Sequence, residues 1–566
     1  RRTTWAQRRR AGRLARLLKD RAGLALALAL TDEVTRIEDP ARAARRFADV
    51  VRGSGAPPSL GPLDRALLVA GARLAPRLPR LAAALLGRRV RHEARPVVLP
   101  AEDPAFARHL ARRRAQGIVS NVNVLGEAVL GEEEATRRFQ AVLERVRRPD
   151  VSYVSVKVSA VCSQLNSLAF DAEVARVADR LGPLYTAAQN QSPPVFLNLD
   201  MEEHRDLELT VAVFQRVLEA PGRLGLSAGI VLQAYLPDSH AAADELVAWA
   251  RDRHQRGGAP VKVRLVKGAN LAMERVEAEV RGWPQAPYAT KAEVDASYKR
   301  LLDVLLAAGD AVRVGVASHN LFDVAWAIVV ARAAGALPRI DVEMLEGMAE
   351  GEARAVAAAL GGLVLYTPIA RADDMTSAIA YLVRRLDEGR APENFLRHLF
   401  GLTPVSASFA AQRDRFLDSV ADRHHVHARP RHRQDRAAEE AGGRSVEPDA
   451  PFVNEPDTDL ALPANRTWVT DHLARFATTA PTEVALRVAG RDLLPNLDGC
   501  GRDPSAGGRP SYRYARADAG LVDAAVAAAR AAQAGWAATP AAERRRLLTG
   551  AAEVMARERG RTIAAM

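Results

Sequence analysis

A chain of 566 residues is too long for a single hydrophobic core and indicates roughly two to four domains. Apolar residues make up 48% of the chain, charged residues 26% and aromatic residues only 5%, which is typical of a globular protein with cores of Ala, Leu and Val. The formal charge of +12 comes mainly from scattered arginines, and without a basic stripe or stacking aromatics it argues against nucleic-acid binding.

Residues 1–95 are predicted to form a helical arm rich in Ala, Leu and Arg, interrupted at residues 39–40 and 53–62. The apolar run at residues 23–30 has the length of a signal-peptide core, but acidic residues follow it directly, so we do not interpret it as one. The sequence contains no apolar run of the ~20 residues needed to cross a membrane. Because the first residue is Arg1 and Met566 lies within a helical pattern, we interpret the chain as a piece of a longer protein.

Residues 96–415 alternate between short β-branched runs and amphipathic stretches long enough for helices. Eight such runs are predicted as strands: 117–124, 153–159, 195–201, 229–235, 261–268, 312–319, 340–347 and 362–369. Repeated strand–helix units form a parallel sheet, and eight of them predict an α/β fold, a closed (βα)8 TIM-like barrel. An open doubly wound sheet is the alternative, and it is disfavoured because no run ends in a GxGxxG turn.

Polar side chains recur at the carboxyl ends of these runs, although barrel strands are covered on both faces and should be apolar. They are Lys157, Asp200, Gln233, Arg264, Lys267, His319, Asn320, Glu346 and Tyr366, with Asn123 and Glu127 in the first unit. Each one alone has a structural explanation, as a paired buried charge or a side chain solvated in a loop. Because strand ends and βα loops face one cavity in a barrel, their recurrence predicts a functional site there.

The segment 373–388 is predicted as a helix with an apolar stripe of Met375, Ile379, Leu382 and Leu386. Tyr381, Arg384, Arg385 and Glu388 fall on the opposite face. Adjacent guanidinium groups bind a small carboxylate in a bidentate manner, whereas a solvated helix face is the simpler alternative.

The predicted cavity has more cations than acids, so we expect an anionic ligand. A metal site is disfavoured because His319 is the only histidine at a strand end. A Schiff-base lyase using Lys157 or Lys267 stays open, although a catalytic lysine does not need several arginines around it.

Residues 416–450 form a polar linker with a histidine cluster at 424–432 and no hydrophobic periodicity, and residues 451–566 are predicted to form a further segment. A helix is predicted to begin at Thr539-Pro540, an N-cap followed by proline. The two cysteines, Cys162 and Cys500, are far apart and form no CxxC, so neither a disulfide framework nor a cysteine metal site is predicted, and a cytoplasmic location fits.

Seven motifs in order along residues 115–400 resemble the proline dehydrogenase family, in particular the proline-oxidising half of bifunctional proline utilisation proteins. The motifs are Val156-Lys157-Val-Ser159-Ala160, Leu197-Asn-Leu-Asp200-Met-Glu202-Glu203, Gln233-Ala-Tyr235, Arg264-Leu-Val-Lys267-Gly268-Ala269, Ser318-His319-Asn320, Leu345-Glu-Gly347-Met348 and Tyr381-Leu-Val-Arg384-Arg385-Leu-Asp-Glu388. The resemblance implies a barrel that binds FAD without a covalent bond and oxidises L-proline to 1-pyrroline-5-carboxylate by hydride transfer to flavin N5.

The resemblance also assigns roles to individual residues. For the substrate, it implies that Arg384, Arg385 and Lys157 bind the carboxylate of proline, that Asp200 and Tyr366 support them, that Leu345 packs on the ring, and that Glu127 gates the site. For the cofactor, it implies contacts with Gln233, Arg264, Lys267, Gly268, Ala269, Ser318, His319, Asn320 and Glu388. Because the last helix of this family covers the barrel mouth, the polar face of 373–388 would face the flavin. One departure stands out: Asn270 follows Lys-Gly-Ala where the family often has an aromatic residue, which leaves the selectivity for the proline ring open.

Residues 451–566 resemble the junction of the bifunctional proteins and the first helices of an aldehyde dehydrogenase. Their catalytic cysteine segment is absent, because Cys500 precedes the region and lacks the surrounding motif. Oxidation of glutamate semialdehyde with NAD is therefore expected only of a longer parent protein. The resemblance further implies a quinone or other electron acceptor, with a peripheral position at the inner face of the membrane left open, and a homo-oligomeric parent. A non-catalytic scaffold built on the helical arm is the remaining alternative.

Overall fold

The computed structural model describes residues 20–34, 37, 39–94, 96–126, 128–371, 381, 394–399, 402–442, 451, 453–478, 481–504 and 507–566. The chain divides into two compact units. The first runs to residue 431 without residues 280–283, and the second comprises residues 280–283 and 432–566.

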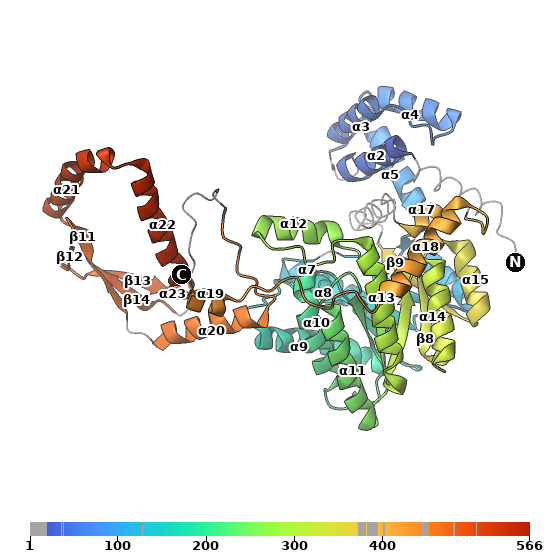
Figure 1. Ribbon diagram of the computed structural model, residues 1–566. Coiled ribbons are helices and arrows are strands. Elements are labelled where there is room, and N and C mark those ends of the chain that lie inside the picture. The colour runs from blue at the N-terminus through green and yellow to red at the C-terminus, as the bar shows by residue number, and fades with distance from the viewer. Residues whose placement is uncertain are drawn as a thin grey trace. The chain divides into compact units, whose positions relative to one another are not determined.

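A closed parallel β-barrel forms the centre of the first unit (Figure 1). Its strands are β2 (Ile118–Val124), β3 (Tyr153–Lys157), β4 (Phe196–Asp200), β5 (Gly229–Gln233), β6 (Val261–Val266), β7 (Val312–Ala317), β8 (Ile340–Leu345) and β9 (Leu363–Ala370). They pair in chain order, and β9 pairs with both β8 and β2, which closes the barrel. The short β1 (Leu99–Pro100) pairs with the end of β9. The eight predicted strands are therefore present, and the predicted (βα)8 barrel is confirmed.

Helices alternate with the strands. In chain order they are α6 (Ala105–Arg114), α7 (Glu132–Val146), α8 (Val158–Val161), α9 (Phe170–Gln189), η2 (His204–Asp206), α10 (Leu207–Leu218), α11 (Ser239–Gln255), α12 (Leu271–Arg281), α13 (Lys291–Leu306), η3 (Gly309–Ala311), α14 (Leu321–Ala333), η4 (Leu337–Arg339), α15 (Glu350–Leu360), α17 (Phe395–Leu399) and α18 (Ala407–Asp422). Two helix starts follow from local sequence. Thr290 and Glu293 form a capping box at α13, and the Asn320 side chain accepts a hydrogen bond from the Phe322 N–H (3.0 Å) at α14.

The hydrophobic core lies between the outer face of the barrel and the surrounding helices, and it consists mainly of Val, Leu and Ala. The strands were predicted to be apolar on both faces, but charged side chains lie inside the barrel. Lys262 on β6 and Glu343 on β8, each 1% exposed, form an ion pair of 2.5 Å inside it. The Lys262 ammonium also lies 5.1 Å from the centre of the Tyr153 ring on β3. Charged residues therefore fill part of the layer that side chains from alternate strands form inside such barrels.

The N-terminal arm is helical where it is described, with α2 (Arg21–Ala29), η1 (Leu30–Val34), α3 (Pro40–Ser54), α4 (Pro62–Leu74) and α5 (Pro79–Ala94). It has a small apolar core of its own around Leu26, Val34 and Val51. No helix in the described part of the chain has an apolar stretch long enough to cross a lipid bilayer.

Part of the segment predicted as a polar linker is fixed on the first unit. Helix α18 continues to Asp422, and Arg300 of α13 donates a hydrogen bond to the Val426 carbonyl (2.7 Å). The Tyr288 ring packs against His427 with 5.1 Å between ring centres. Hydrogen bonds and ring contacts thus order residues that lack a hydrophobic period. Residues 443–450 lie outside the described residues, and the predicted boundaries 416–450 stay a prediction.

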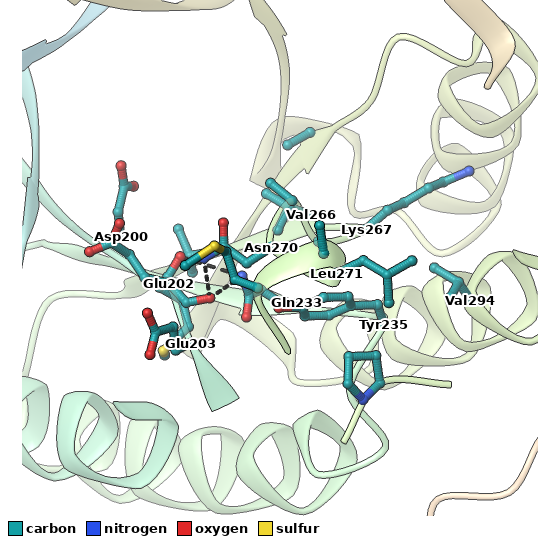
Figure 2. A pocket seen from close by; sticks show the side chains of 18 of the residues that line it. Asp200, Glu202, Glu203, Gln233, Tyr235, Val266, Lys267, Asn270, Leu271 and Val294 are labelled. Atoms are coloured by element: carbon teal, nitrogen blue, oxygen red, sulfur yellow. Dashed lines mark hydrogen bonds between the residues drawn. The ribbon is translucent and has the colours of Figure 1, made fainter. Parts of the chain in front are cut away.

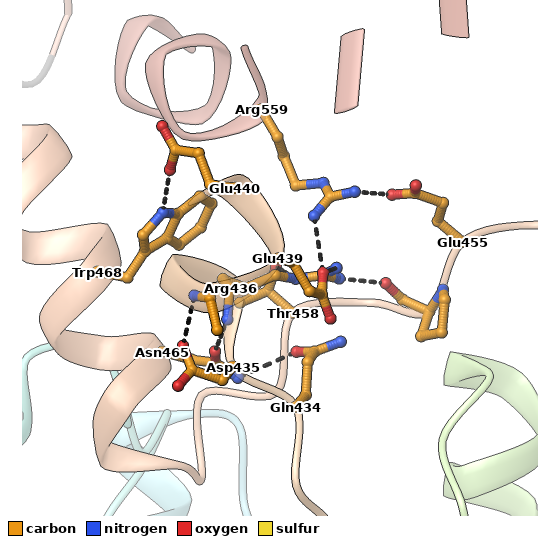
Figure 3. A network of polar contacts seen from close by, with 12 residues as sticks. Gln434, Asp435, Arg436, Glu439, Glu440, Glu455, Thr458, Asn465, Trp468 and Arg559 are labelled. Carbon is orange, nitrogen blue, oxygen red and sulfur yellow. Dashed lines mark hydrogen bonds and ion pairs between the residues drawn. The ribbon is translucent and has the colours of Figure 1, made fainter. Parts of the chain in front are cut away.

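The second unit contains α19 (Arg436–Gly442), α20 (Pro463–Thr478), β10 (Thr482–Val484), β11 (Leu486–Val488), β12 (Arg491–Leu493), β13 (Gly499–Asp503), β14 (Arg509–Tyr514), α21 (Ala519–Ala538), α22 (Ala541–Arg557) and α23 (Arg559–Ala565). A polar network connects its first and last helices (Figure 3). Arg559 contacts Glu439 of α19 (3.2 Å) as well as Glu455, and Trp468 of α20 donates to Glu440 (2.5 Å). Segments more than 100 residues apart are therefore held together by charge.

Candidate active site

A cavity of about 1810 Å³ lies at the carboxyl ends of the barrel strands. Twelve of the residues predicted for the site line it: Lys157, Asp200, Gln233, Arg264, Lys267, Gly268, Ala269, Ser318, His319, Asn320, Leu345 and Tyr366. Strand ends and the loops that follow them supply these side chains, as the barrel fold requires. The structure therefore brings together residues that are spread over 210 positions of the sequence.

Four predicted site residues, Glu127, Arg384, Arg385 and Glu388, lie outside the described residues. Their positions stay predictions from the sequence. Within the segment 373–388 the structure describes Tyr381, which is 6% exposed, packs with Val98 and Leu125, and lines the cavity.

Arg264 lies between two carboxylates at the floor of the cavity. Its Nε donates to Glu343 (2.7 Å), and its Nη1 is 3.6 Å from Asp200. The guanidinium carbon also lies 4.8 Å from the centre of the Tyr366 ring, a cation–π contact. Burial by itself lowers the pKa of Arg264, but Glu343 and Asp200 outweigh it and raise the pKa above its ordinary value. Arg264 is therefore a permanent cation in the site.

Asp200 is held by neutral donors from three strands. Its Oδ2 accepts hydrogen bonds from the Tyr366 hydroxyl (2.7 Å) and from Asn123 (3.2 Å), and its Oδ1 accepts one from Asn198 (2.9 Å). Asn123 also contacts the Tyr366 hydroxyl. Burial and the nearby Asp200 charge raise the pKa of Tyr366 well above its usual value, which keeps the phenol protonated as a donor.

Lys267 forms the centre of a second charged group. Its ammonium lies 2.5 Å from Asp295 of α13 and 2.6 Å from Asp323 of α14, and Asp323 is also 2.9 Å from Lys299. Burial lowers the pKa of Lys267, but the two carboxylates reverse this effect and raise it. Lys291 contacts Asp295 as well. Carboxylates near the starts of two helices, α13 and α14, thus fix a fully charged lysine beside the Gly268 loop.

Lys157 at the end of β3 is also paired. Its ammonium lies 2.6 Å from the Glu202 carboxylate, which follows β4 and accepts a further hydrogen bond from Ser159. This contact involves the charged form of the lysine, whereas Schiff-base chemistry needs the neutral amine. The pairing does not favour the lyase alternative.

The expected excess of positive charge is not found in the described lining of the cavity. This lining holds eight Lys and Arg side chains, at positions 157, 205, 264, 267, 275, 291, 299 and 415. It also holds eight Asp and Glu side chains, at positions 200, 202, 203, 206, 295, 323, 343 and 418. The predicted excess of positive charge rests on Arg384 and Arg385, which lie outside the described residues, so it stays a prediction, while the described lining adds acids that the sequence did not reveal.

Two further residues were predicted to lie at the cavity, His319 and Glu346, and only His319 lines it. The His319 Nε2 accepts a hydrogen bond from the Leu345 N–H (2.9 Å), which places the proton of the neutral ring on Nδ1 and fixes the end of β8. Glu346, predicted at the cavity, contacts Arg113 and His109 of α6 instead. Its prediction was wrong because the strand has ended at Leu345, so the side chain faces a helix outside the barrel.

Sequence reasoning missed Glu343, Asp295 and Asp323, whose carboxylates pair with the cations of the site, and it missed Lys262, the buried partner of Glu343. A signal was present in two of the strands. On β6, Lys262 and Arg264 are two residues apart and therefore point to the same face of the strand. On β8, Asp341 and Glu343 are also two residues apart. Two buried strands thus carry charges of opposite sign at every second residue, which indicates that they pair. Among the described residues, no group of three or more His, Cys, Asp or Glu side chains is arranged to hold a metal ion.

A closed (βα)8 barrel with a cavity of paired charges at its strand ends has the arrangement in which barrel enzymes bind small polar substrates. Residues 106–398 match the family described as "Proline dehydrogenase". Since this match covers more than half of the chain, the protein belongs to the proline dehydrogenase family. Residues 502–566 match the "Aldehyde dehydrogenase family".

Individual relatives agree with this assignment. The chain is 26% identical over 301 residues to the proline dehydrogenase of Deinococcus radiodurans, covering 52% of this chain and 81% of the relative. It is 40% identical to proline utilization A from Corynebacterium freiburgense (TM-score 0.58), covering 74% of this chain and 41% of that one. Proline utilization A from Bdellovibrio bacteriovorus is 25% identical (TM-score 0.78), covering 98% of this chain and 54% of that one. The chain therefore spans about half the length of these two solved proteins.

Proposed function

We propose that the barrel oxidises L-proline to 1-pyrroline-5-carboxylate with bound FAD and passes the electrons to a quinone-type acceptor. The observation that carries this proposal is the permanently charged Arg264, held by Asp200 and Glu343 in the cavity of a member of the proline dehydrogenase family. The lyase alternative has no comparable support, because Lys157 is paired with Glu202.

The residues of the cavity fit an FAD molecule. The volume of about 1810 Å³ exceeds that of a typical small-ligand pocket. Gly268 has a φ of +121°, and a Cβ at this position would lie 2.4 Å from the Tyr235 ring, so only glycine lets the loop after β6 pack on this tyrosine at the wall of the cavity. Lys267 and the start of α14 at Asn320 supply positive charge and N–H groups suited to phosphate.

The flavin would be held by Gln233, Lys267, Gly268, Ala269, Ser318, His319 and Asn320, with Arg264 beside it and Glu388 predicted from the sequence. When bound, FAD supplies the acceptor for the hydride that leaves the substrate. Arg264 keeps positive charge in the cavity throughout the ordinary pH range, because its pKa is raised. This charge favours an electron-rich partner next to it.

Lys157 would bind the substrate through its carboxylate. Arg384 and Arg385 are predicted to bind the same carboxylate, and Glu127 is predicted to gate the site. An ammonium has three N–H donors, so its bond to Glu202 leaves others for a ligand. Asp200 and Tyr366 form a rigid wall of the cavity, and Leu345 adds an apolar contact. Fixing the carboxylate orients the ring carbon beside the nitrogen, which is a proximity effect and requires no protein nucleophile.

The experiment is the visible spectrum of the purified protein after incubation with FAD. We expect flavin absorption near roughly 450 nm. In the absence of oxygen, L-proline should bleach this absorption and D-proline should not. Failure to bind flavin would refute the proposal, whereas borohydride trapping of a carbonyl compound on Lys157 would support the lyase. Arg385→Met should raise the KM for proline by at least about 30-fold without loss of flavin, because truncating one partner of a buried charge pair costs about 2 to 5 kcal/mol.

For a longer parent protein we propose a second activity, oxidation of glutamate semialdehyde with NAD, supported by the match of residues 502–566. We further propose a cytoplasmic, homo-oligomeric parent, with its acceptor at the inner face of the membrane. Light scattering and membrane co-sedimentation of the parent protein test these two points.

A further inference from the structure

The Asn270 side chain, in the loop after β6, is a buried hydrogen-bond donor and does not act as an apolar wall. It is 8% exposed, and its amide nitrogen donates a hydrogen bond to the Glu202 carbonyl (2.8 Å). Figure 2 shows Asn270, in the loop after β6, and Gln233, the last residue of β5, converging on Glu202.

The Glu202 carbonyl therefore receives two side-chain donors. Gln233, which is 2% exposed, donates to the same oxygen at 3.2 Å. Residues 201–203 lie in the loop between β4 and η2, where no ladder of backbone hydrogen bonds fixes the chain. The buried side-chain amides of Asn270 and Gln233 hold this part of the backbone instead, and they fix the direction in which the Glu202 side chain leaves it.

That side chain reaches the substrate end of the cavity. The Glu202 carboxylate contacts the Lys157 ammonium (2.6 Å) and the Ser159 hydroxyl, and the two charged side chains are 13% and 16% exposed. A charge-assisted contact in such a partly buried place depends strongly on geometry. Displacing the Glu202 backbone would therefore displace the ammonium as well.

We propose that Asn270 is a positioning residue that acts through Glu202 to hold Lys157 in place for the carboxylate of the substrate. The proposal rests on the proposed function and deepens it. An apolar side chain at this position would have no donor for the carbonyl, so it would leave Glu202, and with it the Lys157 ammonium, less constrained.

The test is a double-mutant cycle on the flavin-loaded protein, with Asn270→Leu, Glu202→Ala and both together. Asn270→Leu keeps the branched shape of the side chain, although it is larger, and removes the donor, and we expect it to raise the KM for L-proline about tenfold while kcat stays within about twofold. In the Glu202→Ala background the same change should alter KM less than about twofold, because the backbone carbonyl remains but the carboxylate through which Asn270 acts on Lys157 is gone. Asn270→Gln, which keeps an amide donor, should recover part of the loss, and Asn190→Ala, at an exposed asparagine, is the matched control.

Three results would overturn the proposal: an unchanged KM in Asn270→Leu, equal effects in both backgrounds, or no recovery by Asn270→Gln. If Asn270→Leu does not fold, Asn270→Asp replaces it as a variant of the same shape without the donor. Bleaching of the wild-type flavin by L-proline is recorded first. A wild type that is not bleached refutes the proposed function and this role with it, whereas a bleached wild type with equal effects in both backgrounds refutes only the role of Asn270.

Discussion

Glu343→Gln is the change that tests most directly how charge stabilises this barrel. The Glu343 side chain is fully buried and lies 2.5 Å from Lys262 and 2.7 Å from Arg264. Glutamine has nearly the same shape but no charge, so the change leaves two buried cations with less compensation. Lys262 retains Asp341 at 3.0 Å, and Arg264 retains Asp200 at 3.6 Å.

The expected loss of unfolding free energy follows from these distances. Removing one partner of a buried ion pair costs about 3 to 5 kcal/mol. Because each cation keeps a second carboxylate, we expect the lower end, about 3 kcal/mol, or a fall in Tm of about 6 °C for a domain of this size. Lys262→Met together with Glu343→Gln should recover at least half of the loss, since the double variant removes both charges of the shorter pair.

The assay is urea unfolding followed by circular dichroism, with hydrogen exchange measured on peptides from β6 and β8 to assign the change to the barrel. Two compact units make a single two-state transition a poor assumption, which is why the local readout is needed. Asp310→Asn, at an ion pair of 3.5 Å whose aspartate is 86% exposed, is the control and should leave stability unchanged. Loss of less than about 1 kcal/mol in Glu343→Gln, or no recovery in the double variant, would refute the reasoning.

Two further predictions concern backbone and pH. Gly268→Ala should abolish flavin binding and destabilise the barrel, because a Cβ would lie 2.4 Å from the Tyr235 ring. Gly257→Ala, at a positive φ of +81° with open space around it, should cost only the backbone strain of that conformation and leave flavin binding unchanged, and equal effects on flavin absorption would contradict the steric argument. His240 donates to or accepts from Ser297 at 3.0 Å, and burial, followed by the charges of nearby groups, lowers its pKa to about 4. Because the unfolded chain binds this proton below about pH 6.5 and the folded chain only below about pH 4, stability should fall by about 2 to 3 kcal/mol as the pH drops through that window and should be unaffected above it. His240→Gln should flatten this part of the curve of unfolding free energy against pH, and an unchanged slope would exclude His240 as its source.

The course of the barrel could be predicted because its signals are local. Runs such as 229–235 and 312–319 combine β-branched residues with a fixed spacing to the next helix, and this spacing is retained in β5 and β7. The ends of the strands were predicted less accurately, since six of the eight predicted runs extended one or two residues beyond the end of the observed strand. Glu346 was misplaced for this reason, because a single residue past β8 changes the direction of a side chain.

The sequence by itself determined the order of the strands, the family and twelve residues of the cavity, because short-range patterns and motifs record these directly. Only the tertiary structure decided which charges meet. Arg264 and Glu343 are 79 positions apart and become partners when the barrel closes, and the same closure directs Asn270 to a backbone carbonyl and away from a stacking role. Coulomb energy depends on distance in space and on burial, and neither quantity is written in the spacing of residues along the chain.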